Sequence, residues 1–142
     1  MTQSFNGAKA ATFIGDRLLV ILRDDTPGID YPDHWDFPGG GREPGETGLE
    51  TLAREMDEEV GLPLEEAELL WSVLLPAPHR PDVRTWFFVV RFPEGAEEKV
   101  RFGDEGRLWE LADVGDVMAR PKLVPVLRDR LAMWLDRAGH RA

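Results

Sequence analysis

The sequence contains no cysteine among its 142 residues. This absence excludes disulfide frameworks, thiolate zinc sites and thiol nucleophiles, and it fits the reducing conditions of the cytoplasm. No stretch approaches the 18 apolar residues that would span a bilayer, and residues 1–9 lack the basic start and apolar run of a signal peptide. We therefore expect an untargeted cytoplasmic protein that does not enter a membrane.

Basic residues are scarce relative to acidic ones. The chain has 17 Lys and Arg against 27 Asp and Glu, which gives a net charge of −10. Such a surface repels nucleic acid polymers and anionic lipid, so neither is an expected partner. Hydrophobic residues make up 42% of the chain and charged residues 31%, as in folded globular proteins. The length suits one domain, which we expect to span residues 1–142.

Short apolar runs separated by turn residues predict several strands. The pair Gly15-Asp16 between two such runs predicts a β-hairpin. The three glycines at 39–41 are expected to lie outside any strand or helix, because glycine weakens both. Residues 24–33 and 76–81 contain prolines and are expected to form loops. The expected strands are residues 8–14, 17–22, 34–37, 68–75, 84–92 and 108–111.

Two helices are also predicted. Thr47 and Glu50 form the sequence pattern of a capping box, and Gly61 marks the end of the same helix. A second amphipathic helix is expected from Lys122 to the C-terminus, with Pro125 tolerated in its first turn. Strands interleaved with these helices predict an α/β layered domain. The apolar stripe of the first helix is expected to contain Leu49, Leu52, Ala53, Met56 and Val60.

The first predicted helix carries three glutamates on a second face. Glu55, Glu58 and Glu59 stand at i, i+3 and i+4, a spacing that brings their carboxylates together despite their mutual repulsion. A divalent cation would offset that repulsion, because Mg²⁺ and Mn²⁺ prefer oxygen ligands. The alternative is a solvated acidic face, which is common on charged helices.

The context of the glutamates is more specific than their spacing. Gly40 is followed after five residues by Glu46 and, after seven more, by the string REMDEEVGL at 54–62. This arrangement resembles the Nudix box, G-x5-E-x7-R-E-U-x-E-E-x-G-U with U a bulky aliphatic residue, and all nine specified positions of residues 40–62 match. The chain is therefore similar to the MutT-like Nudix hydrolases.

The resemblance implies a fold and a chemistry. The expected fold is an α/β/α sandwich with a mixed β-sheet and a loop-helix-loop catalytic motif. The expected reaction is the Mg²⁺- or Mn²⁺-dependent hydrolysis of a nucleoside diphosphate linked to a moiety X, so the expected partner is a small nucleotide or nucleoside diphosphate derivative. Members of the family are frequently dimers, and a homodimer is one assembly that the resemblance allows.

The same resemblance implies roles for individual residues. Glu58 and Glu59 correspond to the principal metal ligands, and Glu55 to a further ligand or the general base. Arg54 corresponds to the residue that orients one of these carboxylates. The backbone carbonyl of Gly39, just before the box, corresponds to another ligand, and glycine there would let the chain bring this carbonyl close to a metal.

Two further acids receive different expectations. Glu46 precedes the helix and is expected to be structural, by accepting hydrogen bonds or pairing with Arg54. Family members often add an acid from a later loop as ligand or base, and we select Glu105 over Asp104, Glu97 and Glu98 because it shortly precedes a predicted strand that starts near an aromatic residue. A solvated loop acid is the alternative.

Residues outside the box are candidates for substrate contacts. Arg23 ends a predicted strand. It could contact a phosphate, and the alternative is an ordinary charged residue at the end of a strand. Trp35 and Phe37 precede the glycines, and we expect one to face the core while the other stacks on a base, with core packing as the alternative for each. His79 and Arg80 lie in a proline-flanked loop, where they either contact a phosphate or sugar or face solvent.

The substrate is not specified by the box. The compact chain is most similar to (d)NTP pyrophosphohydrolases of the housecleaning type, and an ADP-ribose or nucleotide-sugar pyrophosphatase is the alternative. Removal of an RNA cap is disfavoured by the lack of a basic groove. Two hypotheses of another class are a non-catalytic nucleotide-sensing Nudix domain and an interaction domain with a solvated acidic helix.

Overall fold

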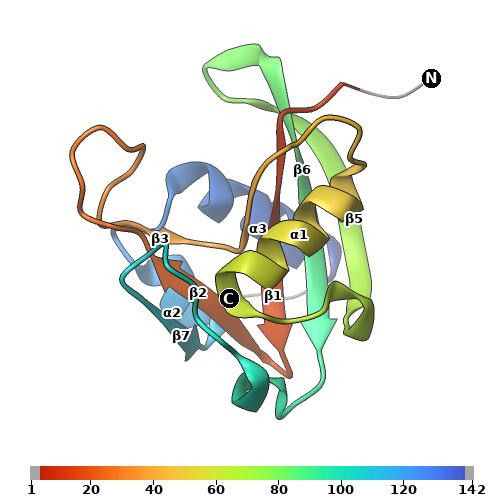
Figure 1. The fold of residues 1–142 in the computed structure, drawn as a ribbon, viewed down its shortest axis with the longest axis vertical. Helices are drawn as coiled ribbons and strands as arrows, with labels where there is room; N and C mark the ends of the chain where they lie inside the picture. The colour runs from red at the N-terminus through yellow and green to blue at the C-terminus, as the bar shows by residue number, and fades with distance from the viewer. Residues whose placement is uncertain (1–3, 140–142) are drawn as a thin grey trace.

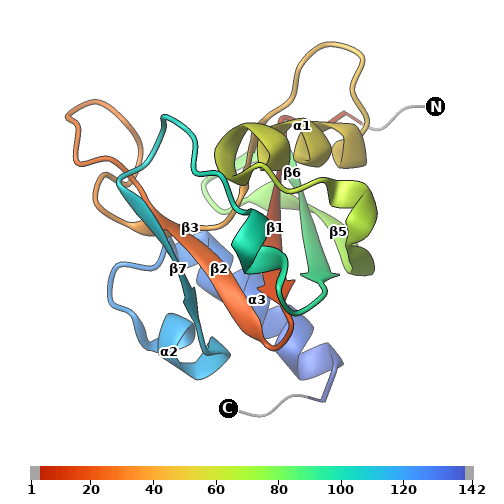
Figure 2. The same cartoon turned by 60° about the horizontal axis from the view of Figure 1, so that its bottom comes forward.

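The computed structural model describes residues 4–139. In this range seven strands form one sheet, with α-helices on both of its faces (Figures 1 and 2). The strands are β1 (Gly7–Ile14), β2 (Arg17–Leu22), β3 (Trp35–Asp36), β4 (Gly39–Gly41), β5 (Glu68–Ala77), β6 (Arg80–Phe92) and β7 (Leu108–Ala112). The helices are α1 (Gly48–Val60), α2 (Val114–Ala119) and α3 (Pro125–Arg137), and two 3₁₀ turns are η1 (Leu64–Glu66) and η2 (Ala96–Lys99). The predicted α/β class is confirmed.

The sheet is mixed, as predicted. Its main order is β3-β2-β1-β6-β5, while β4 pairs with β1 and β7 pairs with β2. The central strands β1 and β6 run parallel, with Ala10 opposite Phe88, and the other pairs are antiparallel. The predicted hairpin is confirmed, since Ile14 lies opposite Arg17 across the turn at Gly15.

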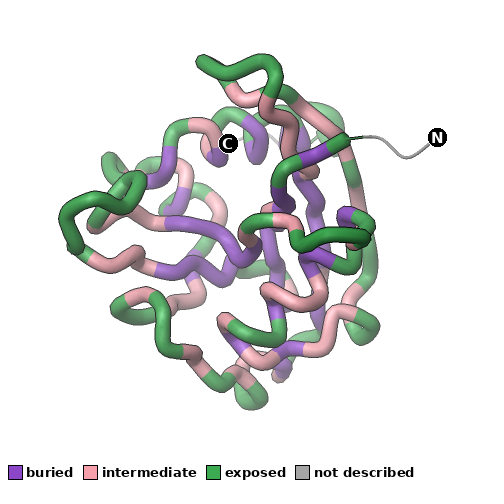
Figure 3. The backbone as a smooth tube through the Cα atoms, turned by 45° about the horizontal axis from the view of Figure 1, so that its top comes forward, coloured by how far each residue is buried: buried purple, intermediate pink, exposed green. Residues whose placement is uncertain are grey.

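Both faces of the central strands are buried (Figure 3), so these strands are apolar at successive positions. Helix α1 covers one face, and α2 and α3 cover the other (Figure 2). The core under α1 includes Ala8, Ala10, Leu19, Ile21, Phe88 and Val90 from the sheet and Leu52, Met56 and Val60 from the helix. The opposite core includes Phe13, Leu18, Val20, Phe37, Phe87 and Val89 with Val117, Leu127, Leu131 and Trp134.

The prediction that the three glycines lie outside any strand is wrong. Residues 39–41 form β4, which pairs with β1 through Gly7–Gly41 and Lys9–Gly39. Glycine is favoured because the backbones are close: a Cβ on Gly39 would lie 2.1 Å from the Ala8 carbonyl oxygen, and its φ of 137° suits glycine. Glycine weakens a strand through its larger conformational entropy, but it occurs here because the neighbouring backbone leaves no room for a side chain.

Other boundaries differ from the sequence expectations. The β5–β6 hairpin is longer than predicted, so the expected loop at 76–81 shrinks to residues 78–79. The six-residue α2 was not predicted, because one and a half turns carry little periodicity. Helix α3 begins at Pro125, three residues after the predicted start, with proline in the first turn as expected. None of the helices in residues 4–139 combines the length and apolarity that crossing a bilayer demands.

Candidate active site

Helix α1 has the ends that the sequence predicts. The Thr47 hydroxyl accepts a hydrogen bond from the Glu50 amide at 3.2 Å, and the Glu50 carboxylate accepts one from the Thr47 amide at 2.8 Å. Gly61 ends the helix in the left-handed conformation. Leu49 differs from its prediction, because its side chain is exposed rather than part of the buried stripe. The buried stripe and the two caps fix which way the glutamates of α1 face.

Glu46 and Arg54 join the loop before α1 to the helix, as predicted. Arg54 donates from Nε to Glu46 Oε2 at 2.8 Å and from Nη2 to Glu46 Oε1 at 3.1 Å. Glu46 also accepts from the Thr51 hydroxyl and the Glu43 amide, both at 2.8 Å. The Arg54 hydrogen bond is the main reason that the pKa of Glu46 falls to about 2. Arg54 further donates to the carbonyl of Gly41 at 2.8 Å, which ties β4 to α1.

Glu55 packs against the start of the box. A Cβ on Gly40 would lie 1.9 Å from Glu55 Oε1, so glycine is required to seat this carboxylate beside β4. Burial raises the pKa of Glu55, and the neighbouring Arg54 partly opposes the rise. The Arg54 guanidinium lies 3.4 Å from Glu55 Oε2. Arg54 thus lies within ion-pair distance of Glu46, Glu55 and Glu58, three carboxylates of the box, and positions them relative to one another.

Glu59 is the most strongly perturbed acid of the helix. Burial raises its pKa to about 7, against the opposing attraction of Lys9 and the hydrogen bond from the Gly39 amide. That amide donates to Glu59 Oε1 at 2.7 Å. The bond connects α1 directly to β4, so the last glutamate of the motif and the glycine before it meet in space. Such a displaced pKa in a cleft is typical of functional carboxylates.

Glu58 has a different environment. Its side chain is 56% exposed; Arg54 Nη1 lies 3.6 Å from Glu58 Oε2, and Glu58 also interacts with the neighbouring Glu55 carboxyl. Glu58 is thus the exposed member of the three glutamates, whereas Glu55 and Glu59 are partly buried.

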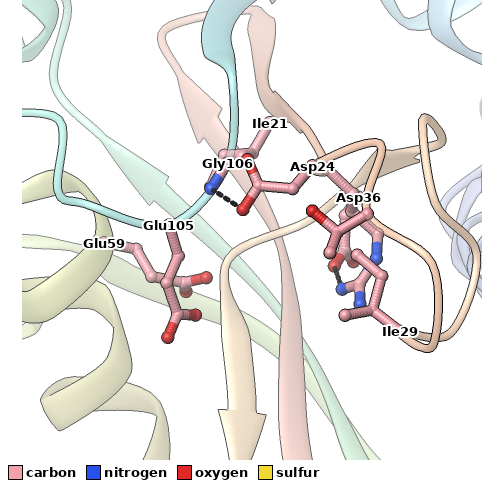
Figure 4. A pocket seen from close by; sticks show the side chains of 9 residues that line it. Ile21, Asp24, Ile29, Asp36, Glu59, Glu105 and Gly106 are labelled. Atoms are coloured by element: carbon pink, nitrogen blue, oxygen red, sulfur yellow. Dashed lines mark hydrogen bonds and ion pairs between the residues drawn. The ribbon is translucent and has the colours of Figure 1, made fainter.

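A cavity of about 370 Å³ lies beside these residues, and we call it the acidic cavity. Figure 4 shows that the Glu59 and Glu105 side chains reach it from α1 and from the loop before β7. The loop is held by the Gly106 amide, which donates to Asp24 Oδ2 at 3.2 Å. The structure thus brings the selected loop acid, Glu105, into the same cavity as Glu59. The cavity is lined by Ile21, Arg23, Asp24, Thr26, Ile29, Asp36, Glu59, Glu105 and Gly106.

A charged cluster beside this cavity was not predicted from the sequence. Asp36 Oδ2 accepts from Lys9 Nζ and from Arg23 Nη1, both at 2.9 Å. Lys9 also donates to the Gly39 carbonyl at 3.1 Å. Arg23 therefore combines a structural ion pair with a place on the cavity wall. The signal for Asp36 was present, because an acid between Trp35 and Phe37 in a strand must face away from their side of the sheet.

The prediction for Trp35 and Phe37 is wrong, since residues two apart in a strand point to the same face. Phe37 has 0% of its surface exposed and lies in the core under α3, so it cannot stack on a base. Trp35 packs against the same core, and the Arg120 guanidinium lies 4.4 Å above its ring. Neither ring lines the acidic cavity. Both follow the core-packing alternative.

His79 and Arg80 are also outside the acidic cavity. They lie at the exposed tip of the β5–β6 hairpin, which projects from the body of the molecule (Figure 1). The description of this segment as solvent-facing fits both residues. Neither residue lines the acidic cavity, and a contact of either with the substrate stays a prediction.

Comparison with known proteins decides the family. The sequence matches the model of the NUDIX domain over residues 8–135. The chain belongs to the Nudix family. Among curated relatives, a nucleoside triphosphatase NudI from Salmonella arizonae is 36% identical over 82 residues, which are 58% of this chain and 51% of the relative. An RNA pyrophosphohydrolase from Legionella pneumophila is 50% identical over 40 residues, 28% of this chain and 23% of the relative.

The chain thus spans about a quarter to a half of the length of these two Nudix relatives. A solved structure covers much more: the Ap4A hydrolase of C. elegans in a binary complex matches 95% of this chain and 99% of its own, with a TM-score of 0.74 and 17% identity. At that identity the likeness concerns the fold alone. It agrees with the mixed sheet and the helices on both faces described above.

The residues of this Nudix site fit a divalent cation in their chemistry. Glu55 and Glu59 are carboxylates whose raised pKa values reflect burial. The Gly39 amide donates to Glu59, and the Gly39 carbonyl is an uncharged oxygen that accepts from Lys9 Nζ at 3.1 Å. Across residues 4–139, no three Asp, Glu or His side chains are gathered into a metal site by themselves. Magnesium sites in proteins commonly use one or two carboxylates and take further oxygens from substrate phosphates and water, so such a partial set suffices.

Proposed function

We propose that this chain hydrolyses a phosphoric anhydride bond in a nucleoside diphosphate linked to a moiety X, with Mg²⁺ or Mn²⁺, and that it acts as a (d)NTP pyrophosphohydrolase. The observation that carries the proposal is the pairing of Glu59, whose pKa is about 7, with Glu105 in one cavity next to the cationic Arg23. The complete box and a relative described as a nucleoside triphosphatase support it.

Several residues would hold the cation. Glu59 and the Gly39 carbonyl form the inner part, since the Gly39 amide already bonds to Glu59. The carbonyl now accepts from Lys9 Nζ and would exchange that ammonium group for the cation. Glu55 and Glu58 supply the other carboxylates, and Glu105 is kept for the proton transfer described below. When bound, the divalent cation supplies positive charge that polarises a phosphoryl oxygen and makes water a better nucleophile. In a chain of net charge −10, this charge is needed to hold a polyphosphate at all.

The chain's own groups bind the phosphates, accept a proton from water and orient a carboxylate. Arg23, on the wall of the acidic cavity, contacts the phosphates. Glu105 accepts a proton from water as the water oxygen bonds to phosphorus. The anhydride P–O bond then breaks, and the leaving group keeps the bridging oxygen. From a nucleoside triphosphate the products are a nucleoside monophosphate and pyrophosphate. Arg54 orients Glu55 through their 3.4 Å contact.

A substrate panel tests this proposal. We expect Mg²⁺- or Mn²⁺-dependent release of pyrophosphate from the four dNTPs and oxidised dGTP. ADP-ribose, a nucleotide sugar, diadenosine tetraphosphate and 5′-triphosphorylated RNA form the other arms. Faster turnover of one of those arms would replace the dNTP assignment with that substrate class. Nucleotide binding without turnover of any arm would support the non-catalytic sensing alternative and overturn the enzymatic proposal.

Variants of two carboxylates identify the proton acceptor. Glu105→Gln should lower kcat at saturating Mg²⁺ and leave the metal affinity unchanged, because an amide cannot accept the proton. Glu55→Gln should lower the metal affinity and recover most of its kcat at saturating Mg²⁺. The reverse pattern would transfer the role of base to Glu55. A cytoplasmic location and a homodimer stay predictions, which cell fractionation and sedimentation of the full chain would check.

A further inference from the structure

A second cavity, of about 280 Å³, adjoins the acidic cavity, and we call it the arginine cavity. The two share Arg23 and Asp36 on their walls. The arginine cavity is bounded by the start of α3, where Val126 and Leu127 form an apolar wall, and by Pro78 of the β5–β6 hairpin. A group attached to a phosphate in the acidic cavity therefore has an adjoining, mostly apolar space to enter.

Arg130 lines the arginine cavity from α3 and is only 5% exposed. Its Nη1 donates to the Thr85 hydroxyl at 2.5 Å and its Nη2 to the Pro76 carbonyl at 3.3 Å. Both acceptors are neutral, and no acid in residues 4–139 forms an ion pair with this guanidinium. Burial lowers its pKa, with no acid to oppose the change. A guanidinium has five N–H donors, so three remain.

The other cations near this cavity differ from Arg130. Lys9 and Arg23 share the carboxylate of Asp36 at 2.9 Å each. Burying a charge without an acidic partner is costly unless other acceptors satisfy its donors. The remaining donors of Arg130 are thus available to an acceptor that enters the cavity from outside the chain.

The walls limit what this acceptor can be. Lys9, Arg23, Asp30 and Asp36 also line the cavity, but both of these cations are already paired with Asp36. The apolar part of the wall suits a flat ring better than a second phosphate, and the ring must present acceptors to Arg130. A nucleobase joined to phosphates in the acidic cavity meets both conditions. Arginine pairs well with the O6 and N7 acceptors of a 6-oxopurine, whereas adenine places an amino donor at position 6. Two donors facing each other would leave both without a partner.

We propose that the arginine cavity receives the base of the nucleotide and that Arg130 selects bases with a carbonyl oxygen over bases with an amino group at the same position. This inference rests on the proposed function, since it takes a nucleotide to be the substrate. It makes Arg130 a specificity-determining residue that the box does not include.

The test compares dITP with dATP, because their bases differ at position 6 and in the attached N1 proton. We expect kcat/KM to favour dITP by about 10- to 100-fold. Arg130→Met should reduce the preference to within about threefold, mainly because kcat/KM for dITP falls. Asp129→Asn, an exposed change on the same helix, should keep the full preference. Equal kcat/KM values in the unaltered protein, or an unchanged preference in Arg130→Met, would overturn the inference.

A binding measurement on the unaltered protein distinguishes failure of this inference from failure of the proposed function. It does not require any variant to fold. Competition of dIMP and dAMP for the unaltered protein in the presence of Mg²⁺ should favour dIMP by a similar factor, since neither monophosphate has an anhydride bond that the protein could hydrolyse. That preference without turnover would sink the enzymatic proposal and support the cavity assignment. Turnover of dNTPs with equal binding of the two monophosphates would sink the cavity assignment alone.

Discussion

Glu46 and Glu59 belong to the same motif, yet their surroundings push their pKa values in opposite directions. Glu46 lies in a ring of donors from Arg54, Thr51 and the Glu43 amide, and its pKa is about 2. Glu59 is partly buried and accepts from one amide, and burial raises its pKa to about 7. The difference separates a carboxylate whose charge is already neutralised within the chain from one that still needs a cation.

The two carboxylates also give opposite pH dependence of stability. A folded pKa below the unfolded value stabilises the protein above about pH 4.5, and this contribution of Glu46 is lost as the pH falls towards 2. A folded pKa above the unfolded value has the reverse effect. Glu59 does not affect the free energy of unfolding below about pH 4.5, where it is protonated in both states. Between about pH 4.5 and 7 its raised folded pKa lowers the free energy of unfolding. Substitutions at Glu46 or Glu59 therefore test whether the two carboxylates differ in this way.

The largest expected effect is on turnover. Glu59→Gln keeps the shape of the side chain but removes the charge that would hold the cation. We expect kcat/KM to fall by more than about 100-fold at saturating Mg²⁺, a loss of roughly 3 kcal/mol of transition-state stabilisation. Asp57→Asn, on the exposed side of the same helix, should keep normal turnover. Near-normal hydrolysis by Glu59→Gln, or by Glu58→Gln, would remove that residue from the metal site.

The next effect concerns the stability of the metal-free protein. Between pH 4.5 and 7 the free energy of unfolding should fall by up to about 3 kcal/mol, because the unfolded chain ionises Glu59 while the folded chain keeps it protonated. Urea unfolding in chelator across this range measures the slope. Glu59→Gln should flatten it, apart from a smaller contribution of the same sign from Glu55. An identical slope in this variant would contradict the raised pKa.

Removing the neutralised carboxylate should affect stability more than chemistry. Glu46→Gln leaves Arg54 without its bidentate partner, so we expect the melting temperature at pH 7 to drop by several degrees while metal affinity changes little. Glu43→Gln is the matched control, since Glu43 is exposed and lies 3.6 Å from Arg54. A large loss of metal affinity with unchanged melting would reverse the roles assigned to Glu46 and Glu59.

The smallest effect is expected at Lys9. Lys9→Met removes the cation that attracts the Glu59 carboxylate, so the pKa of Glu59 should rise further, by about one pH unit. Carboxyl ¹³C NMR during a pH titration measures this value. Lys99→Met, at an exposed surface pair with Glu66, should leave it unchanged. A lower pKa of Glu59 in Lys9→Met would contradict the electrostatic account.

Local signals explain what the sequence could predict. The capping box of Thr47 and Glu50, the end at Gly61 and the apolar stripe depend on neighbours within a few residues, so they define α1 without the rest of the fold. The Glu46–Arg54 pair was also accessible, because both belong to one motif. The strand at 39–41 was missed because its stability comes from pairing with residues of β1 that lie 30 to 34 positions earlier.

The missed site residues depend on tertiary contacts in the same way. Asp36 acquires its partners Lys9 and Arg23 only when β1, β2 and β3 assemble. Arg130 looks like an ordinary helix-surface charge, and its burial follows from the packing of α3 below the hairpin. The error at Phe37 was avoidable, because strand alternation alone places it on the side of Trp35 and opposite Asp36.

The pKa of Glu59 with and without Mg²⁺ tests the central claim most directly. Carboxyl ¹³C NMR of the unaltered chain should give a value of about 7 in chelator and a value well below the ordinary glutamate range at saturating Mg²⁺, since a bound cation favours the ionised form. A pKa of Glu59 that does not move on addition of Mg²⁺, in protein shown to bind the ion, would contradict the assignment of Glu59 as the carboxylate that holds it.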